Sequence, residues 1–217
     1  MPEPQFRLYL VTDCQVCAPD RLLAILARLG DELPPGTLAV QLREKDLCTS
    51  DLLDLAGRVR DVLAPRAVPL LINDRIDVAL AIGAQGVHLP GTGFGPGDAR
   101  RIWPGLIGIS THAQTPDACF GEVDFCTFGP VFDTPSKRPY GPPQGLGPLR
   151  TAAAASRIPL FAIGGITPAN AGLLADTGIH GIAVIRALLQ ASNPVATARL
   201  LLERASIGAN RRAMSQG

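Results

Sequence analysis

Cationic and polar side chains follow several short apolar segments of this 217-residue chain. Gln41, Arg43 and Lys45 alternate directly after one apolar run, and Asn73 and Asp74 follow the next. The same kind of position is occupied further along by Ser110, His112, Thr134, Ser136 and Lys137. Cations and hydroxyls bind anions, and one carboxylate beside an amide can hold Mg²⁺ that phosphate groups also bind. Each residue alone would suit a solvated loop, but their occurrence together indicates an anion site.

A second candidate anion site is the turn after the apolar segment Pro159–Ile163. Gly164 and Gly165 allow a sharp turn with unblocked amides, and Thr167 and Pro168 are typical of a helix N-terminus. Strand, bare turn and helix N-terminus together make a phosphate cradle. The alternative is a packing site at which glycine merely avoids a clash.

A similar junction follows near the end of the chain, where Gly181–Val184 precedes a helix-like segment, Ile185–Gln190. Two neighbouring junctions of this kind are typical of the phosphate loops after strands 7 and 8 of a (β/α)8 barrel.

The elements that must position these residues alternate between strand and helix. Strands are expected at Arg7–Thr12, Thr37–Leu42, Val68–Ile72, Gly86–Leu89, Leu106–Ser110, Asp124–Phe128, Pro159–Ile163 and Gly181–Val184. Helices are expected at Asp20–Leu29, ending at Gly30, and at Ser50–Leu63, Arg75–Ile82, Pro96–Trp103, Thr115–Phe120, Leu149–Ser156, from Pro168 onward, at Ile185–Gln190 and at Pro194–Ile207. Such alternation predicts an α/β fold with parallel strands, closed as a single (β/α)8 TIM barrel over residues 1–207. Residues 208–217 are expected to be a flexible tail.

Composition narrows the class of function. The net charge of +1, without a basic stripe, argues against nucleic acid as a partner. No apolar run is long enough for a membrane span, and the start of the chain does not resemble a signal peptide. The five cysteines are an odd number, which suits reduced thiols and a cytoplasmic protein; Cys14 and Cys17 have the spacing of a metal or redox pair, but no second pair accompanies them. The oligomeric state is open, and a homodimer is among the states allowed.

Several of these segments together resemble one family over nearly the whole chain. The matching motifs are Gln41-Leu-Arg43-Glu-Lys45, Ile72-Asn73-Asp74-Arg75, Gly86-Val-His88, Ser110-Thr-His112, Thr134-Pro-Ser136-Lys137 and Gly164-Gly165-Ile166-Thr167. They are similar to the thiamin phosphate synthase and thiazole tautomerase family. Each motif alone is weak, whereas the set is specific.

The resemblance implies thiamin biosynthesis on two small-molecule substrates. In the synthase branch, hydroxymethylpyrimidine diphosphate loses pyrophosphate to give a pyrimidine carbocation, which the nitrogen of hydroxyethylthiazole phosphate captures. By family match, the pyrophosphate would be held by Arg43, Lys45, Asn73 and Lys137, with hydrogen bonds from Ser110, Thr134 and Ser136. Asp74 would hold Mg²⁺. Gly165 and the backbone amides of Val184 and Ile185 would seat the thiazole phosphate, and Gly164 and Gln41 belong to the same substrate-binding set. Arg186 stands where the family often has a small serine, and it is either an additional anion clamp or points away from the phosphate.

One departure from the synthase pattern leaves the branch open. Synthases present acidic residues shortly after the histidine of strand 4, whereas the segment from His88 through Gly93 to Phe94 has none. This glycine-rich version resembles the tautomerase branch, in which His112 would act as a metal-independent general acid and base. The retained cations and Asp74 favour the synthase. A third alternative, a non-catalytic regulator that binds thiazole phosphate, fits the retained reactive side chains less well.

Overall fold

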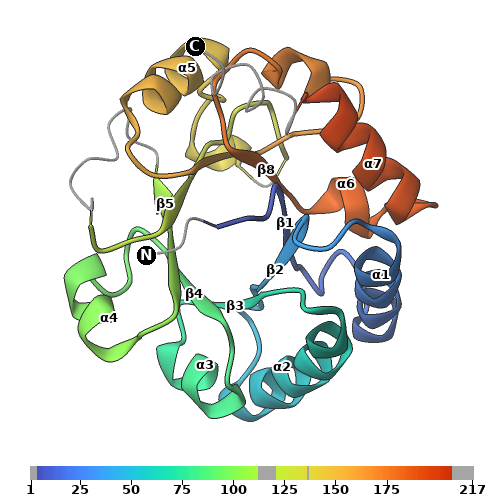
Figure 1. The fold of residues 1–217 in the computed structure, drawn as a ribbon, viewed down its shortest axis with the longest axis vertical. Coiled ribbons are helices and arrows are strands. Elements are labelled where there is room, and N and C mark those ends of the chain that lie inside the picture. The colour runs from blue at the N-terminus through green and yellow to red at the C-terminus, as the bar shows by residue number, and fades with distance from the viewer. Residues whose placement is uncertain (1–3, 112–120, 136, 207–217) are drawn as a thin grey trace.

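A computed structural model describes residues 4–111, 121–135 and 137–206 of the chain (Figure 1). Within these residues, eight parallel strands pair in chain order, and β1 pairs with β8 to close the barrel. The strands are β1 (Leu8–Val11), β2 (Leu38–Leu42), β3 (Leu70–Asn73), β4 (Gly86–Leu89), β5 (Leu106–Thr111), β6 (Phe125–Phe128), β7 (Leu160–Ile163) and β8 (Gly181–Val184). The predicted α/β barrel is confirmed.

Helices surround the strands as an outer layer (Figure 1). The α-helices are α1 (Pro19–Glu32), α2 (Thr49–Leu63), α3 (Ile76–Ile82), α4 (Pro96–Ile102), α5 (Leu146–Ala155), α6 (Arg186–Leu189) and α7 (Pro194–Arg204). Short 3₁₀ helices are η1 (Ala64–Arg66), η3 (Arg138–Tyr140) and η4 (Ala171–Leu174). No helix among the described residues is both long and apolar enough to cross a membrane.

Aromatic side chains fill the inside of the barrel. The rings of Phe6, Tyr9, Phe125 and Phe161 pack against one another at centroid distances of 5.1 to 6.1 Å. Small residues on other strands make room for them. A Cβ built on Gly108 would lie 2.4 Å from the Phe125 ring, so a larger residue at position 108 would displace that ring.

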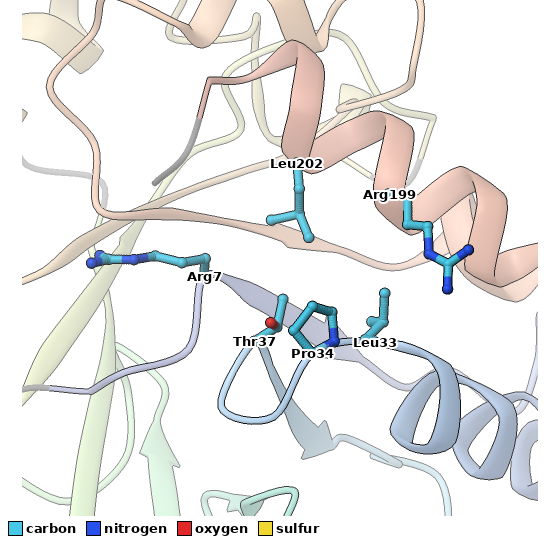
Figure 2. Close-up of a pocket in the computed structure, with 6 residues that line it drawn as sticks. All are labelled: Arg7, Leu33, Pro34, Thr37, Arg199 and Leu202. Carbon is cyan, nitrogen blue, oxygen red and sulfur yellow. The ribbon is translucent and has the colours of Figure 1, made fainter. Parts of the chain in front are cut away.

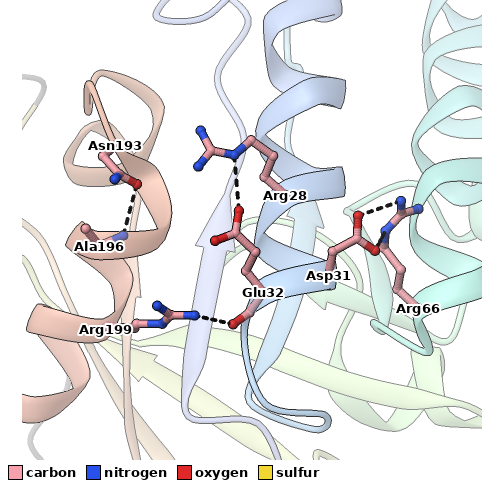
Figure 3. Close-up of polar contacts among 7 residues, drawn as sticks. All are labelled: Arg28, Asp31, Glu32, Arg66, Asn193, Ala196 and Arg199. Carbon is pink, nitrogen blue, oxygen red and sulfur yellow. Dashed lines mark hydrogen bonds and ion pairs between the residues drawn. The ribbon is translucent and has the colours of Figure 1, made fainter.

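Polar contacts join α7 to α1, and α1 to η1, the 3₁₀ helix that follows α2 (Figure 3). Arg199 donates to the carbonyl of Glu32 at 2.7 Å, and Arg66 forms a two-pronged ion pair with Asp31 at 2.7 and 3.0 Å. The predicted end of the first helix at Gly30 is wrong, because α1 continues to Glu32. A Cβ on Gly30 would lie 2.6 Å from Arg66 Cδ. The glycine therefore lets the Arg66 stem cross the helix.

The helix expected from Pro168 onward is also corrected. The segment after β7 forms turns and then the 3₁₀ helix η4, and Thr167 is not its N-cap. Asn170 shapes this turn instead, since its side chain accepts from the Thr167 amide and donates to the Gly165 carbonyl, both at 2.8 Å. The expected helix Thr115–Phe120 and the expected tail 208–217 lie outside the described residues.

Candidate active site

The predicted site residues that the structure describes lie at the carboxyl ends of the strands. Arg43 and Lys45 come just after β2, Asn73 ends β3 and Ser110 is the second-to-last residue of β5. The other positions follow or end their strands: Asp74, Thr134, Lys137, Gly164, Gly165, Val184, Ile185 and Arg186. Because all eight strands are parallel, these positions share one rim of the barrel. His112 and Ser136 lie outside the described residues.

A cation cluster, formed by Arg43, Lys45 and Lys137, is the main electrostatic feature of this rim. Partial burial lowers the pKa of the Lys137 ammonium, and the positive charges of Arg43 and Lys45 lower it further. The cations therefore lie close enough to repel one another. Neither Arg43 nor Lys45 forms an ion pair with a described carboxylate. Concentrated positive charge of this kind favours a polyanionic ligand.

Glu44 lies between two of these cations in sequence but serves to anchor the backbone. Its carboxylate accepts from Thr12 Oγ1 at 2.5 Å and from the Cys14 amide at 2.9 Å. Thr12 Oγ1 in turn accepts from the Arg43 amide at 3.0 Å. These contacts fix the exit of β2 against the exit of β1. Burial and Glu44 raise the pKa of the Cys14 thiol to about 12, which makes it a poor nucleophile or metal ligand.

Asp74 has an uncommon backbone conformation at the end of β3. Its φ is +65°, and its amide donates to the His88 carbonyl of the neighbouring strand at 2.9 Å. Strain of this type in a non-glycine residue gathers at functional sites. The loop after β4 passes directly over the carboxylate, since a Cβ built on Gly93 would lie 2.4 Å from Asp74 Oδ1. No group of three or more metal-ligand side chains occurs among the described residues.

A chain of hydrogen bonds crosses the barrel beneath the rim. Gln41 Nε2 donates to the Tyr9 hydroxyl at 3.2 Å, and that hydroxyl lies 3.3 Å from His88 Nδ1. His88 Nε2 lies 3.0 Å from Ser110 Oγ. Gln41, Tyr9 and His88 are buried, and Ser110 is half-buried. Burial lowers the pKa of His88 to about 3, with Arg43 adding to the effect, so the imidazole is neutral at physiological pH.

The turn after β7 is packed against the loop after β6. Gly164 and Gly165 have φ values of +102° and +64°. A Cβ on Gly165 would lie 2.4 Å from the Asp133 carbonyl oxygen, and the Phe132 amide donates to the Gly164 carbonyl at 3.0 Å. The close approach of the two loops therefore explains the two glycines in part. This is the packing alternative that the sequence left open. The same contacts hold the backbone that leads to Thr134 and Lys137.

The rim at β8 has a shorter helix than expected. The segment Ile185–Gln190 was predicted to be helical, and α6 covers only Arg186–Leu189. Val184 is buried, Ile185 is half-buried and Arg186 is exposed.

Sequence reasoning missed the residues that support the site. Tyr9, Thr12 and Asn170 were given no role, and His88 appeared only within a motif. Tyr9 and Thr12 sit in an expected strand and are not adjacent in sequence to their partners. Tyr9 reaches His88 across the barrel, and Thr12 reaches Glu44 at the exit of the neighbouring strand, so no local sequence pattern reveals these roles.

Two of the hollows on the described surface bear on the choice of site. The larger of the two, of about 380 Å³, lies at the amino-terminal ends of β1 and β2 (Figure 2). This is the end of the barrel opposite to the cation cluster. It is lined by Arg7, Leu33, Pro34, Thr37, Arg199 and Leu202. A hollow of about 340 Å³ beside the rim includes Cys14, Glu44 and Asp46 in its lining. Size alone does not mark the site, because the chemistry of a barrel gathers at the carboxyl ends.

Cys14, Cys17, Cys48 and Cys126 form no disulfide among the described residues, in keeping with the expected reduced thiols. No metal-binding cluster involving Cys14 and Cys17 is found among the residues that the structure describes.

Comparison with known proteins agrees with this geometry. Residues 8–188 match the model of the thiamine monophosphate synthase family. A thiamine-phosphate synthase of Albidiferax ferrireducens is 46% identical over 199 residues, covering 89% of this chain and 90% of that protein. A thiamine-phosphate synthase of Thermus thermophilus is 40% identical over 186 residues, covering 84% and 90%.

The solved structure of a thiamine phosphate pyrophosphorylase from Pyrococcus furiosus superposes with a TM-score of 0.80 at 28% identity. It covers 94% of this chain and 96% of that one. A 3-hexulose-6-phosphate synthase, at 17% identity and a TM-score of 0.65, shares the fold. The family match extends over nearly the whole barrel and includes every rim segment described above, and the chain belongs to the thiamine monophosphate synthase family.

Proposed function

We propose that this protein is a thiamin phosphate synthase, which joins hydroxymethylpyrimidine diphosphate to hydroxyethylthiazole phosphate and releases pyrophosphate. The cation cluster of Arg43, Lys45 and Lys137 is the observation that carries the proposal. A departing pyrophosphate develops negative charge, and preorganised cations stabilise that charge in the transition state. The names and high coverage of the curated relatives support the same activity.

In this reaction the bond from the pyrimidine methylene carbon to the diphosphate oxygen breaks, and its electrons leave with pyrophosphate. The thiazole nitrogen then forms a bond to that carbon. Arg43, Lys45, Asn73 and Lys137 hold the pyrophosphate, and Ser110, Thr134 and Ser136 donate hydrogen bonds to the substrates. Gln41 lies deeper, on the buried side of the site, where its amide is held by Tyr9.

Asp74 is the residue that would hold Mg²⁺. One half-buried carboxylate beside Asn73, near a cluster that binds diphosphate, fits Mg²⁺, which takes one or two carboxylates plus phosphate oxygens and water. The position that a Cβ of residue 93 would occupy, 2.4 Å from Asp74 Oδ1, is where a second carboxylate would reach the same ion. Bound Mg²⁺ would neutralise charge on the leaving pyrophosphate.

The thiazole phosphate is assigned to the opposite side of the rim. Gly164 and Gly165 are half-buried, and their positive φ values turn the backbone after β7. Backbone amides there and at Val184 and Ile185 would donate to the phosphate, and the exposed Arg186 would add positive charge. Both proposed substrates are small molecules, and cysteines that form no disulfide suit a protein of the cytoplasm.

One observation favours a second candidate, the metal-independent tautomerase. Gly93 supplies no carboxylate opposite Asp74, and His112 would then carry the proton transfer on a carboxylated thiazole phosphate. The test compares the parent with His112→Ala, each with and without a chelator. A synthase loses activity in chelator and keeps at least part of it in His112→Ala. A tautomerase is indifferent to chelator and is disabled by His112→Ala.

A further inference from the structure

The buried hydrogen-bond chain from Gln41 to Ser110 links four strands, β2, β1, β4 and β5, just below the rim. We infer that His88, fixed by Tyr9 and Gln41, is a positioning residue that turns the Ser110 hydroxyl into a hydrogen-bond donor toward the substrate. The inference rests on the proposed function, and it adds Tyr9 and His88 to the machinery.

The direction of each hydrogen bond follows from the groups that take part. The Gln41 side-chain nitrogen donates to the Tyr9 oxygen, and an amide NH₂ cannot accept. The Tyr9 hydroxyl is fully buried, so its own proton needs an acceptor, and His88 Nδ1 is the described group in reach at 3.3 Å. His88 Nδ1 must therefore be unprotonated. The neutral ring then carries its proton on Nε2.

The proton on Nε2 sets the role of Ser110. His88 Nε2 donates to Ser110 Oγ, which lies 3.0 Å away. Because the Ser110 oxygen accepts this hydrogen bond, the Ser110 hydroxyl proton does not point toward His88. Ser110 is half-buried at the carboxyl end of β5, whereas Tyr9 and His88 are buried. The free proton thus points to the site, where it meets an acceptor atom such as an oxygen of the departing pyrophosphate.

Packing keeps the imidazole in this orientation. The His88 ring lies 5.7 Å from the Tyr9 ring and 5.8 Å from the Phe125 ring, measured between centroids. On the neighbouring strand, a Cβ built on Gly108 would lie 2.6 Å from His88 Nδ1. The absence of a side chain at residue 108 leaves space for the ring, and the aromatic neighbours restrict its rotation.

Nitrogen NMR of the histidine-labelled protein tests the tautomer without any substrate. Comparison with His88→Gln identifies the His88 signals among those of His112 and His180. The inference predicts an Nε2–H tautomer at neutral pH and a changed Nδ1 signal in Tyr9→Phe. Phe6→Leu is the matched control, because the Phe6 ring packs 5.6 Å from the Tyr9 ring but takes no part in the hydrogen bonds between Gln41 and Ser110. This variant should leave the tautomer unchanged. An Nδ1–H or charged imidazole would overturn the inference.

Steady-state kinetics test the positioning role. Tyr9→Phe should lower kcat by roughly 3- to 10-fold, as for loss of one neutral hydrogen bond. In a Ser110→Ala background the same change should have little further effect, because Tyr9 acts through Ser110. An equal loss in both backgrounds contradicts the role. A parent protein that has the Nε2–H tautomer but forms no thiamin phosphate would refute the proposed synthase. A parent protein that forms thiamin phosphate but has another His88 tautomer would refute only this inference.

Discussion

At the scale of single residues, the main feature of the rim at the carboxyl ends of the strands is the cation cluster of Arg43, Lys45 and Lys137. In the proposed reaction, Lys137→Ala removes one cation from the leaving pyrophosphate, and losing such a transition-state contact typically costs ~10²–10³ in rate. We expect that loss in kcat with both substrates present. Arg101→Ala is the matched control: Arg101 is exposed on α4 and pairs with Asp98, so its removal leaves kcat unchanged. Parent-like turnover by Lys137→Ala would show that the cluster does not bind the leaving group.

The lowered pKa of Lys137 has a consequence for the pH profile. Lys137 loses its proton at a lower pH than an ordinary lysine, because of partial burial and the charges of Arg43 and Lys45. If the protonated form is the active one, kcat/KM falls as pH rises through this lowered pKa. Lys45→Met removes one repelling charge and should move the alkaline limb to higher pH. A limb at the same pH in both proteins would contradict the electrostatic coupling.

At the scale of elements, the turn after β7 joins stability to function. Gly165→Ala places a Cβ against the Asp133 carbonyl oxygen at φ +64°. We expect a loss of about 1–3 kcal/mol in the free energy of unfolding, measured with urea. Gly57→Ala in α2 meets nothing within 4 Å and should instead gain about 0.5–1 kcal/mol. Equal changes in the free energy of unfolding of the two variants would show that a side chain at residue 165 causes no strain.

The loop after β4 offers a test of the proposed Mg²⁺ site at Asp74. Gly93→Asp brings a carboxylate next to Asp74 Oδ1, and the flexible end of Asp74 has to shift to admit it. The expected result is a Mg²⁺ concentration for half-maximal rate that is lower by about tenfold, equal to about 1.4 kcal/mol. Gly93→Asn has the same size without the charge and should not tighten Mg²⁺. An equal effect of both variants would rule out a shared metal site.

Element positions could be predicted from the sequence where a local pattern decides them. Gly181–Val184 is a strand with the expected bounds, and Pro194 does begin the last helix. The prediction failed at Gly30, whose missing side chain admits the Arg66 stem, and at Pro168, where the side chain of Asn170 closes a turn through Thr167 and Gly165 in place of a helix start. A helix stop and a close approach of Arg66 look alike in sequence, so only the tertiary contact separates them.

At the scale of the whole molecule, alternation of strand and helix was sufficient to predict a closed barrel. Val40, Ile72, Ile163 and Val184 lie on parallel strands of that one sheet, as expected. The rim residues followed from the same reasoning, because each lies at the carboxyl end of a predicted strand or in the loop that follows it. The buried chain through Tyr9 and His88 could not be predicted, since it requires the closure and stagger of four strands.

The measurement that tests the central claim most directly is product formation by the purified protein. It is incubated with hydroxymethylpyrimidine diphosphate, hydroxyethylthiazole phosphate and Mg²⁺, and the products are identified by mass spectrometry. The account predicts thiamin phosphate and pyrophosphate in equal amounts, with no thiamin phosphate when either substrate is omitted. Isomerisation of a carboxylated thiazole phosphate without metal, and with no thiamin phosphate formed from the two substrates, would contradict it.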